Sequence, residues 1–129
     1  MSKIDDLLKL TKLLDLEPSS NSKQDSSNEV NICSHLIGKF VIIRTYAAGV
    51  HVGYLKEFDA KNLCVRLEKS RRIWMWKGAF TLSEIANNGI KDGKLCEFVD
   101  EIIVTQVCEI LPTSTNSENQ LNKFPVYIP

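Results

Sequence analysis

The hydrophobic pattern divides the chain into a helical N-terminal segment, a polar stretch and a longer β-rich region. Residues 3–16 carry Ile and Leu at helical spacing, with Asp5 and Asp6 in the first turn, where carboxylates interact favourably with the helix dipole. We expect an amphipathic helix over residues 1–17 that either docks on the main domain or mediates self-association. Residues 18–35 are rich in Ser and Asn, which is typical of a flexible linker.

The region from residue 36 to residue 112 carries the patterns of β-strands. Five segments are rich in β-branched and aromatic residues or alternate apolar with polar residues, and we expect each to be a strand: 38–46, 50–58, 63–69, 71–76 and 99–111. Turn-forming residues separate several of them. The pattern predicts a mainly β (α+β) fold, either a small curved antiparallel sheet or an SH3-like barrel of about five strands.

One short helix is expected before the last strand. The run from Thr81 to Glu84 matches the capping box, and Gly89 suits a left-handed C-terminal cap, so the helix should span about residues 82–88. Residues 113–129 have no regular pattern, although they include Phe124 and Tyr127. We expect this tail to pack on its own domain or on a neighbouring subunit.

The size and the N-terminal residues point to a cytoplasmic protein. A chain of 129 residues fits one domain that needs no disulfide or metal to fold. No apolar run approaches the ~20 residues of a membrane span. The first ten residues contain acids where a signal peptide carries bases. We therefore expect a cytoplasmic location and no contact with membranes.

The sequence lacks the residue patterns that mark common enzymes and metal sites. Its four cysteines form no C-x-x-C pair, so we expect reduced thiols that are mostly buried. The acids Glu97, Asp100 and Glu101 suit a solvated strand edge better than a metal site. No phosphate-binding loop, G-x-S-x-G or H-E-x-x-H motif occurs. We expect no enzymatic activity, no metal and no cofactor.

The charge distribution favours a small anionic ligand over a long polyanion. The chain has 16 basic and 16 acidic residues, yet residues 35–78 contain nine Lys or Arg against three Asp or Glu. A protein that follows DNA or RNA usually has a basic excess over its whole domain. A local excess is compatible with a small anion, or simply with a solvated face, and we expect no long nucleic acid as partner.

Both tryptophans lie within the densest run of cations. Residues two apart in a strand share a face, so we expect Arg72, Trp74 and Trp76 side by side, opposite Ile73 and Met75. The cations of this run are Arg71, Arg72 and Lys77. Such a face could stack a base and bind phosphate oxygens. The rings could instead pack beneath the N-terminal helix or the tail, or form a subunit interface, and the sequence leaves these readings open.

A second candidate group surrounds the turn at residues 47–49. Arg44 and Tyr46 share one strand face, and His51 follows the turn. The small residues of the turn allow a ligand to approach the backbone at Gly49 closely. Because no nucleophile motif or carboxylate partner accompanies His51, we expect it to orient a ligand or to have a structural role rather than to act in catalysis.

Two stretches, VIIRTYAAGVHVGYL (41–55) and RRIWMWKGAFTLSEIANNG (71–89), carry a resemblance to a family. They resemble small proteins of bacteriophages and prophages with the motifs R-T-Y-x-A-G-V-H-x-G-x-L and R-R-I-W-x-W-x-G-A-x-x-L, a family of unknown function. The segments VDEIIVTQVCEILPTS and FPVYIP are similar to its C-terminal part, so the resemblance covers residues 38–129. One departure is Ser70, where the family tends to have Ala. The resemblance implies a phage origin but assigns no site residue.

A phage origin together with these residues leads to a functional expectation. We expect a homo-oligomeric anti-defence protein that binds a cyclic nucleotide immune signal and sequesters it uncleaved. The expected ligand-binding residues are Arg44, Tyr46, Gly49, His51, Arg71, Arg72, Trp74, Trp76 and Lys77. The alternative is an inhibitor that binds a host defence enzyme or effector, because Trp and Arg also dominate protein interfaces. Binding of single-stranded nucleic acid is a third, less favoured reading.

Overall fold

The computed structural model describes residues 32–129. The N-terminal helix expected over residues 1–17, and the expected linker up to residue 31, lie outside the described residues. In the part that is described, no helix is long and apolar enough to cross a membrane. The described chain begins with a short 3₁₀ turn, Ser34–Leu36, and continues into the β-rich region.

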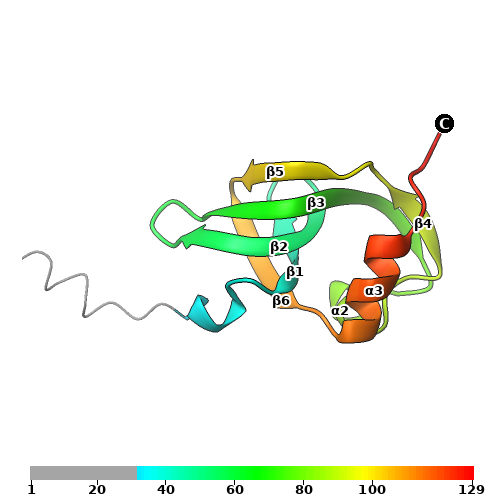
Figure 1. Cartoon of the computed structure of the whole chain (residues 1–129), viewed down its shortest axis with the longest axis horizontal. Helices are drawn as coiled ribbons and strands as arrows, with labels where there is room; N and C mark the ends of the chain where they lie inside the picture. Colours follow the sequence, from blue (N-terminus) through cyan, green and yellow to red (C-terminus); the bar gives the residue numbers. More distant parts are fainter. Residues whose placement is uncertain (1–31) are drawn as a thin grey trace, which may run out of the picture. The chain divides into compact units, whose positions relative to one another are not determined.

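The fold is built on one antiparallel sheet that curls into a half-barrel (Figure 1). Its six strands are β1 (Phe40–Thr45), β2 (Val50–Asp59), β3 (Cys64–Lys77), β4 (Asp92–Leu95), β5 (Val99–Val104) and β6 (Val107–Pro112). The strand order is β4-β3-β2-β1-β6, and β5 pairs with β3 as well. The expected mainly β fold with a curved antiparallel sheet is confirmed, with six strands in place of about five.

The long strand β3 organises the sheet. It pairs with β2 along one edge, and its other edge pairs first with β5 and then with β4. The expectation of two separate strands, 63–69 and 71–76, was wrong. Lys69 adopts a left-handed φ of 51°, and the register with β2 shifts between Val52 and Tyr54, so the strand bends without ending.

The last expected strand, 99–111, is in fact two strands on different edges of the sheet. Gln106 has a left-handed φ of 58° and lies between β5 and β6. This reversal lets β5 pair with β3 while β6 pairs with β1. A Gln in this conformation gives no turn signal in the sequence, because Gly or Asn is the usual residue there.

Each face of the sheet has its own hydrophobic cluster. The first cluster lies beneath the helices and contains Phe40, Ile42, Val52, Ile73, Ile85, Ala86, Ile90, Leu95 and Leu121. The second cluster comprises Leu36, Val41, Ile43, Leu55, Val65, Leu67, Val104 and Val107. Alternation along β1 explains the division, since Ile42 belongs to the first cluster and its neighbours Val41 and Ile43 belong to the second.

Helix α2 (Leu82–Asn88) forms where the capping box was expected. The Thr81 hydroxyl accepts a hydrogen bond from the amide of Glu84 at 3.2 Å, and the Glu84 carboxylate accepts one from the amide of Phe80. Gly89 ends the helix with a φ of 79°. The boundaries of this helix are therefore confirmed.

Helix α3 (Thr115–Lys123) corrects the expectation of an irregular tail over residues 113–129. Ser114 caps the helix by accepting a hydrogen bond from the amide of Ser117, and the Ser117 hydroxyl donates to the Ile85 carbonyl of α2 at 2.6 Å. Leu121 is fully buried. The helix lies beside α2 (Figure 1). Because Leu121 is its one apolar residue, the helix carries no hydrophobic periodicity that the sequence could reveal.

Candidate functional site: a cationic and aromatic surface on strand β3

The turn between β1 and β2 is held rigidly by its own side chains. The Thr45 hydroxyl donates to the Gly49 carbonyl at 2.9 Å and accepts from the amide of Ala48 at 2.8 Å. Gly49 has a left-handed φ of 84°. A Cβ at this position would lie 2.9 Å from Nη2 of Arg72, so the guanidinium rests against the glycine. The turn therefore brings the neighbouring strand's arginine close to exposed backbone.

His51 lies beside Arg72 across the β2–β3 pair. The two residues are register partners, and His51 is buried. Its Nε2–H donates to the Ala48 carbonyl at 3.0 Å. Burial lowers the pKa of His51, and the positive charge of Arg72 lowers it further, although the Ala48 carbonyl works in the opposite direction. The imidazole is therefore neutral at neutral pH and supports the turn as a hydrogen-bond donor.

Trp74 stands on the same strand face as Arg72 and remains 52% exposed. Its ring meets the Tyr127 ring edge to face, with centroids 5.6 Å apart and an interplanar angle of 79°. The ammonium of Lys94, on β4, lies 4.9 Å from the Trp74 centroid and 4.7 Å from the Tyr127 centroid. Two aromatic rings and an ammonium thus form a corner next to Arg72.

The C-terminal residues bring Tyr127 to this corner. The Tyr127 amide donates to the Leu95 carbonyl at 3.0 Å, and Val126 forms a parallel bridge with Leu95. The segment after α3 therefore runs along the outer edge of β4. Tyr127 and Lys94 were both absent from the expected site, because strand β4 was not expected and because the expected packing of the tail did not specify which surface Tyr127 would reach.

Trp76 does not stand beside Trp74, and this expectation was wrong. The register of β3 with β4 shifts between Ile73 and Met75, which inserts a bulge at the first tryptophan. The ring of Trp76 consequently packs against the first hydrophobic cluster, on the same side as Ile73. The partly buried ring of Trp76 therefore contributes to the core and does not form one stacking surface with Trp74.

Arg71 has a structural role in this fold. It is only 2% exposed, and its guanidinium stacks on the Phe98 ring with Cζ 4.4 Å from the centroid. Its nitrogens donate to the carbonyls of Cys96, Leu121 and Phe124 at 2.8, 3.2 and 2.6 Å. Arg71 thus ties the end of α3 to the end of β4.

The remaining expected residues lie outside the corner. The Arg44 Nε donates to the Glu109 carboxylate at 3.0 Å, so this cation is already paired. Tyr46 projects from the β1–β2 turn and is 82% exposed. Lys77 lies exposed at the end of β3, where its carbonyl accepts from the amide of Lys91.

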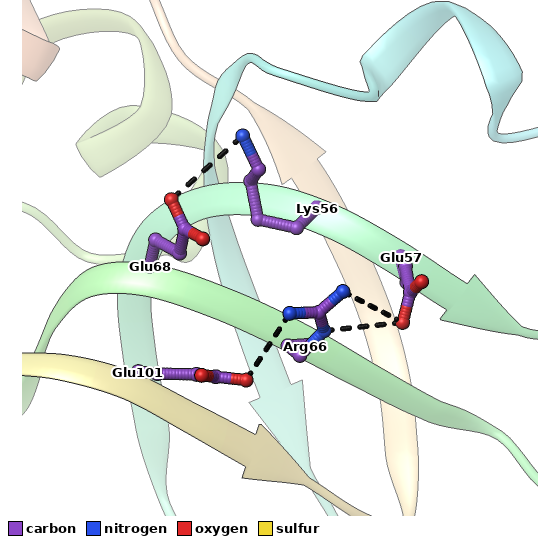
Figure 2. A network of polar contacts seen from close by, with 5 residues as sticks. All are labelled: Lys56, Glu57, Arg66, Glu68 and Glu101. Carbon is purple, nitrogen blue, oxygen red and sulfur yellow. Dashed lines mark hydrogen bonds and ion pairs between the residues drawn. The ribbon is translucent and has the colours of Figure 1, made fainter.

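The pairing of cations differs along β3. At its beginning, Arg66 lies between Glu57 and Glu101, with nitrogen–oxygen distances of 3.0 and 3.2 Å, and the neighbouring Lys56 faces Glu68 (Figure 2). Towards its end, Arg72 has no carboxylate within 4.0 Å among residues 32–129. Within the described residues, positive charge is therefore paired with carboxylates at the beginning of the strand, whereas Arg72 near its end has no such pair.

We name this region the Arg72–Trp74 surface, which consists of Gly49, His51, Arg72, Trp74, Lys94 and Tyr127. Its chemistry is that of binding. An arginine fork suits phosphate or carboxylate oxygens, and an exposed indole suits a flat ring. Among the described residues, no group of three or more His, Cys, Asp or Glu side chains is arranged to hold a metal ion.

Comparisons with known proteins place the chain in a family. No curated protein and no solved structure matches it. A family model matches residues 38–121, which is more than half of the 129 residues and includes all six strands, helix α2 and most of α3. The chain therefore belongs to the DUF6948 family, whose domain is described as one of unknown function.

Proposed function

We propose that the protein binds a small anionic nucleotide on the Arg72–Trp74 surface without transforming it. The observation that carries this proposal is that Arg72, which has no carboxylate partner among residues 32–129, lies on the same strand face as the half-exposed ring of Trp74. A nucleotide combines a flat base with a compact negative charge. Stacking on an aromatic side chain and fork-like binding of phosphate are the interactions that these two residues offer.

Lys94 and Gly49 complete the proposed binding mode. The Lys94 ammonium lies against both aromatic rings, so it can turn towards phosphate when a base takes its place on Trp74. The left-handed Gly49, which has no side chain, lets the Arg72 guanidinium lie directly against the turn. These groups span a surface suited to one small ligand, and the zero net charge of the chain is unfavourable for a long polyanion.

The cellular role that we propose is sequestration of a cyclic nucleotide immune signal by a phage-encoded protein in the host cytoplasm. This role follows from the family resemblance of the sequence motifs and from a site built for binding. Because the Arg72–Trp74 surface is open, a second copy of the chain would be needed to enclose a dinucleotide. A homo-oligomer is therefore part of the proposal.

Isothermal titration of the purified protein with cyclic di- and trinucleotides and cyclic ADP-ribose isomers tests this function. We expect one ligand to bind saturably and to be recovered chemically intact after heat denaturation of the complex. Binding that survives in the Arg72→Ala variant would contradict the proposed site. Recovery of a cleaved product would contradict sequestration.

A second candidate function is inhibition of a host defence protein through the same face. The exposed apolar residues Val126, Tyr127 and Ile128 adjoin the corner, and clusters of Trp, Tyr and Arg form the energetic centre of many protein interfaces. Competition separates the two functions. If a host enzyme still binds when a nucleotide saturates the Arg72–Trp74 surface, that enzyme contacts another surface. If the nucleotide displaces the enzyme, the two bind the same face.

A further inference from the structure

A hollow of about 370 Å³ lies on the opposite side of β3 from Trp74, where α3 ends. We call it the Tyr54–Phe98 hollow, and its lining residues are Tyr54, Lys69, Phe98, Val99, Asp100 and Asn122. They come from β2, the bend of β3, the start of β5 and the end of α3. None of them belongs to the Arg72–Trp74 surface.

The aromatic walls of this hollow are held in place from behind. The Tyr54 hydroxyl donates to the Glu118 carboxylate at 2.7 Å and accepts from the Asn122 amide at 3.1 Å. The Tyr54 ring also meets the Phe40 ring edge to face, with centroids 5.1 Å apart. On the other wall, Phe98 is 41% exposed while its ring lies over the guanidinium of Arg71. Both aromatic rings are therefore held by contacts behind them.

A buried donor of Arg71 lies behind the Phe98 wall of the hollow. Within the described part of the chain, Nη2 of Arg71 is buried and makes no hydrogen bond, and the same holds for the Ser70 hydroxyl. The Arg71 guanidinium stacks on Phe98, whereas Ser70 lies with its Cβ towards Gly53 on β2 and is not a lining residue. Buried polar groups are nearly always satisfied, so the exception at Arg71 calls for a partner such as a water or another small molecule.

The polar groups at the rim indicate which chemistry the hollow accepts. The Lys69 ammonium and the Asn122 amide donate hydrogen bonds, whereas the Asp100 carboxylate accepts them. A plain anion would be repelled by Asp100, and a plain cation by Lys69. A heteroaromatic base carries donors and acceptors on one flat ring, and a hollow at the small end of the usual range of ligand pockets suits one such ring.

We propose that the Tyr54–Phe98 hollow is a binding site for a single nucleobase, which stacks on Phe98 and forms hydrogen bonds with Asn122 and Asp100. Arg71 supports this site from beneath, since its positive charge lies against the far side of the Phe98 ring. The inference stands apart from the proposed function, because it rests on other residues and on Nη2 of Arg71, which has no hydrogen-bond partner in the described chain.

A ¹H–¹⁵N NMR titration of the full chain with AMP, GMP, CMP and UMP tests this site. We expect at least one of the four to shift the Asn122 side-chain amide and the backbone amides of Lys69 and Val99 saturably. Phe98→Leu keeps an apolar side chain but removes the ring, and we expect it to weaken that binding about tenfold. Asp100→Asn changes an exposed side chain and should also weaken it.

Trp74→Ala is the matched control, because it removes an aromatic ring from the Arg72–Trp74 surface and leaves the hollow intact. We expect unchanged affinity at the hollow in this variant. In the natural chain, shifts confined to the Trp74 indole and its neighbours would overturn the hollow site while supporting the proposed function. Equal affinity of the Phe98→Leu variant and the natural chain, or no shift at the hollow with any of the four nucleotides, would overturn it as well.

Discussion

The guanidinium of Arg72 occupies the space that a side chain at Gly49 would need. A Cβ on Gly49 would lie 2.9 Å from Nη2 and 3.0 Å from Nε of Arg72. The glycine therefore has two roles. It adopts the left-handed conformation of the turn, and it leaves room for the cation on which the proposed binding depends.

Replacing Gly49 by alanine should displace Arg72, and Gly38→Ala offers a matched control. Both glycines have a left-handed φ, of 84° and 87°, but a Cβ at Gly38 would meet nothing within 4 Å. We expect each variant to lose about 1 kcal/mol of unfolding free energy in chemical denaturation, because both become strained. In NMR spectra only Gly49→Ala should shift the Nε–H resonance of Arg72. An equal shift in both variants would contradict the contact.

Arg71 and Arg72 should respond very differently to the same substitution. Arg71→Met removes three hydrogen bonds from a buried guanidinium to backbone carbonyls, and we expect a loss of about 3 kcal/mol in unfolding free energy. Arg72→Met changes an exposed side chain without an ion pair in the described chain and should cost less than about 0.5 kcal/mol. Similar losses of unfolding free energy for the Arg71→Met and Arg72→Met variants in urea denaturation would contradict these separate roles.

His51 should make the fold sensitive to mild acid. Its pKa in the folded protein is lowered by burial and by Arg72, so the unfolded chain takes up a proton more readily than the folded one. Stability from this residue is therefore complete above the unfolded pKa of about 6.5 and is lost as the pH falls below it. We expect unfolding free energy to drop between pH 7.5 and pH 5, and to drop less in His51→Gln. Identical pH profiles of the two proteins would contradict the assignment.

The two tryptophans should differ in their contribution to the stability of the fold and in their exposure to solvent. Trp76 packs against the first hydrophobic cluster, so Trp76→Leu should lower the unfolding free energy by about 2 kcal/mol. Trp74→Leu affects a half-exposed ring and should cost less than about 1 kcal/mol. Acrylamide should quench the fluorescence of Trp74 more strongly than that of Trp76 in the corresponding single-tryptophan variants. The reverse order of quenching would mean that the bulge in β3 does not separate the rings.

Signals that lie within a few residues of one another predicted their elements well. Thr81 and Glu84 specify the start of α2, and Gly89 specifies its end, because capping depends on local hydrogen bonds. The alternation of apolar and polar residues over 50–58 likewise predicted a strand where β2 lies. These features need no knowledge of the rest of the chain.

The candidate site was harder to predict, because its geometry depends on pairing between distant strands. A register shift between β3 and β4 decides on which face of β3 Trp74 and Trp76 lie. Strand β4 was not expected from the sequence. Arg71 is buried because carbonyls from α3 and β4 converge on it. Arg72 and Trp74, by contrast, are both exposed and flank the buried Ile73, as their spacing of two predicted.

Fluorescence of a Trp76→Phe variant tests the central claim most directly, since Trp74 is then the one tryptophan in the chain. The folded variant is titrated with cyclic di- and trinucleotides and cyclic ADP-ribose isomers, with and without the further change Arg72→Ala. We predict saturable quenching by one member of the panel and its loss when Arg72 is replaced. Quenching that persists without Arg72, or no response to any member of the panel, would contradict nucleotide binding on the Arg72–Trp74 surface.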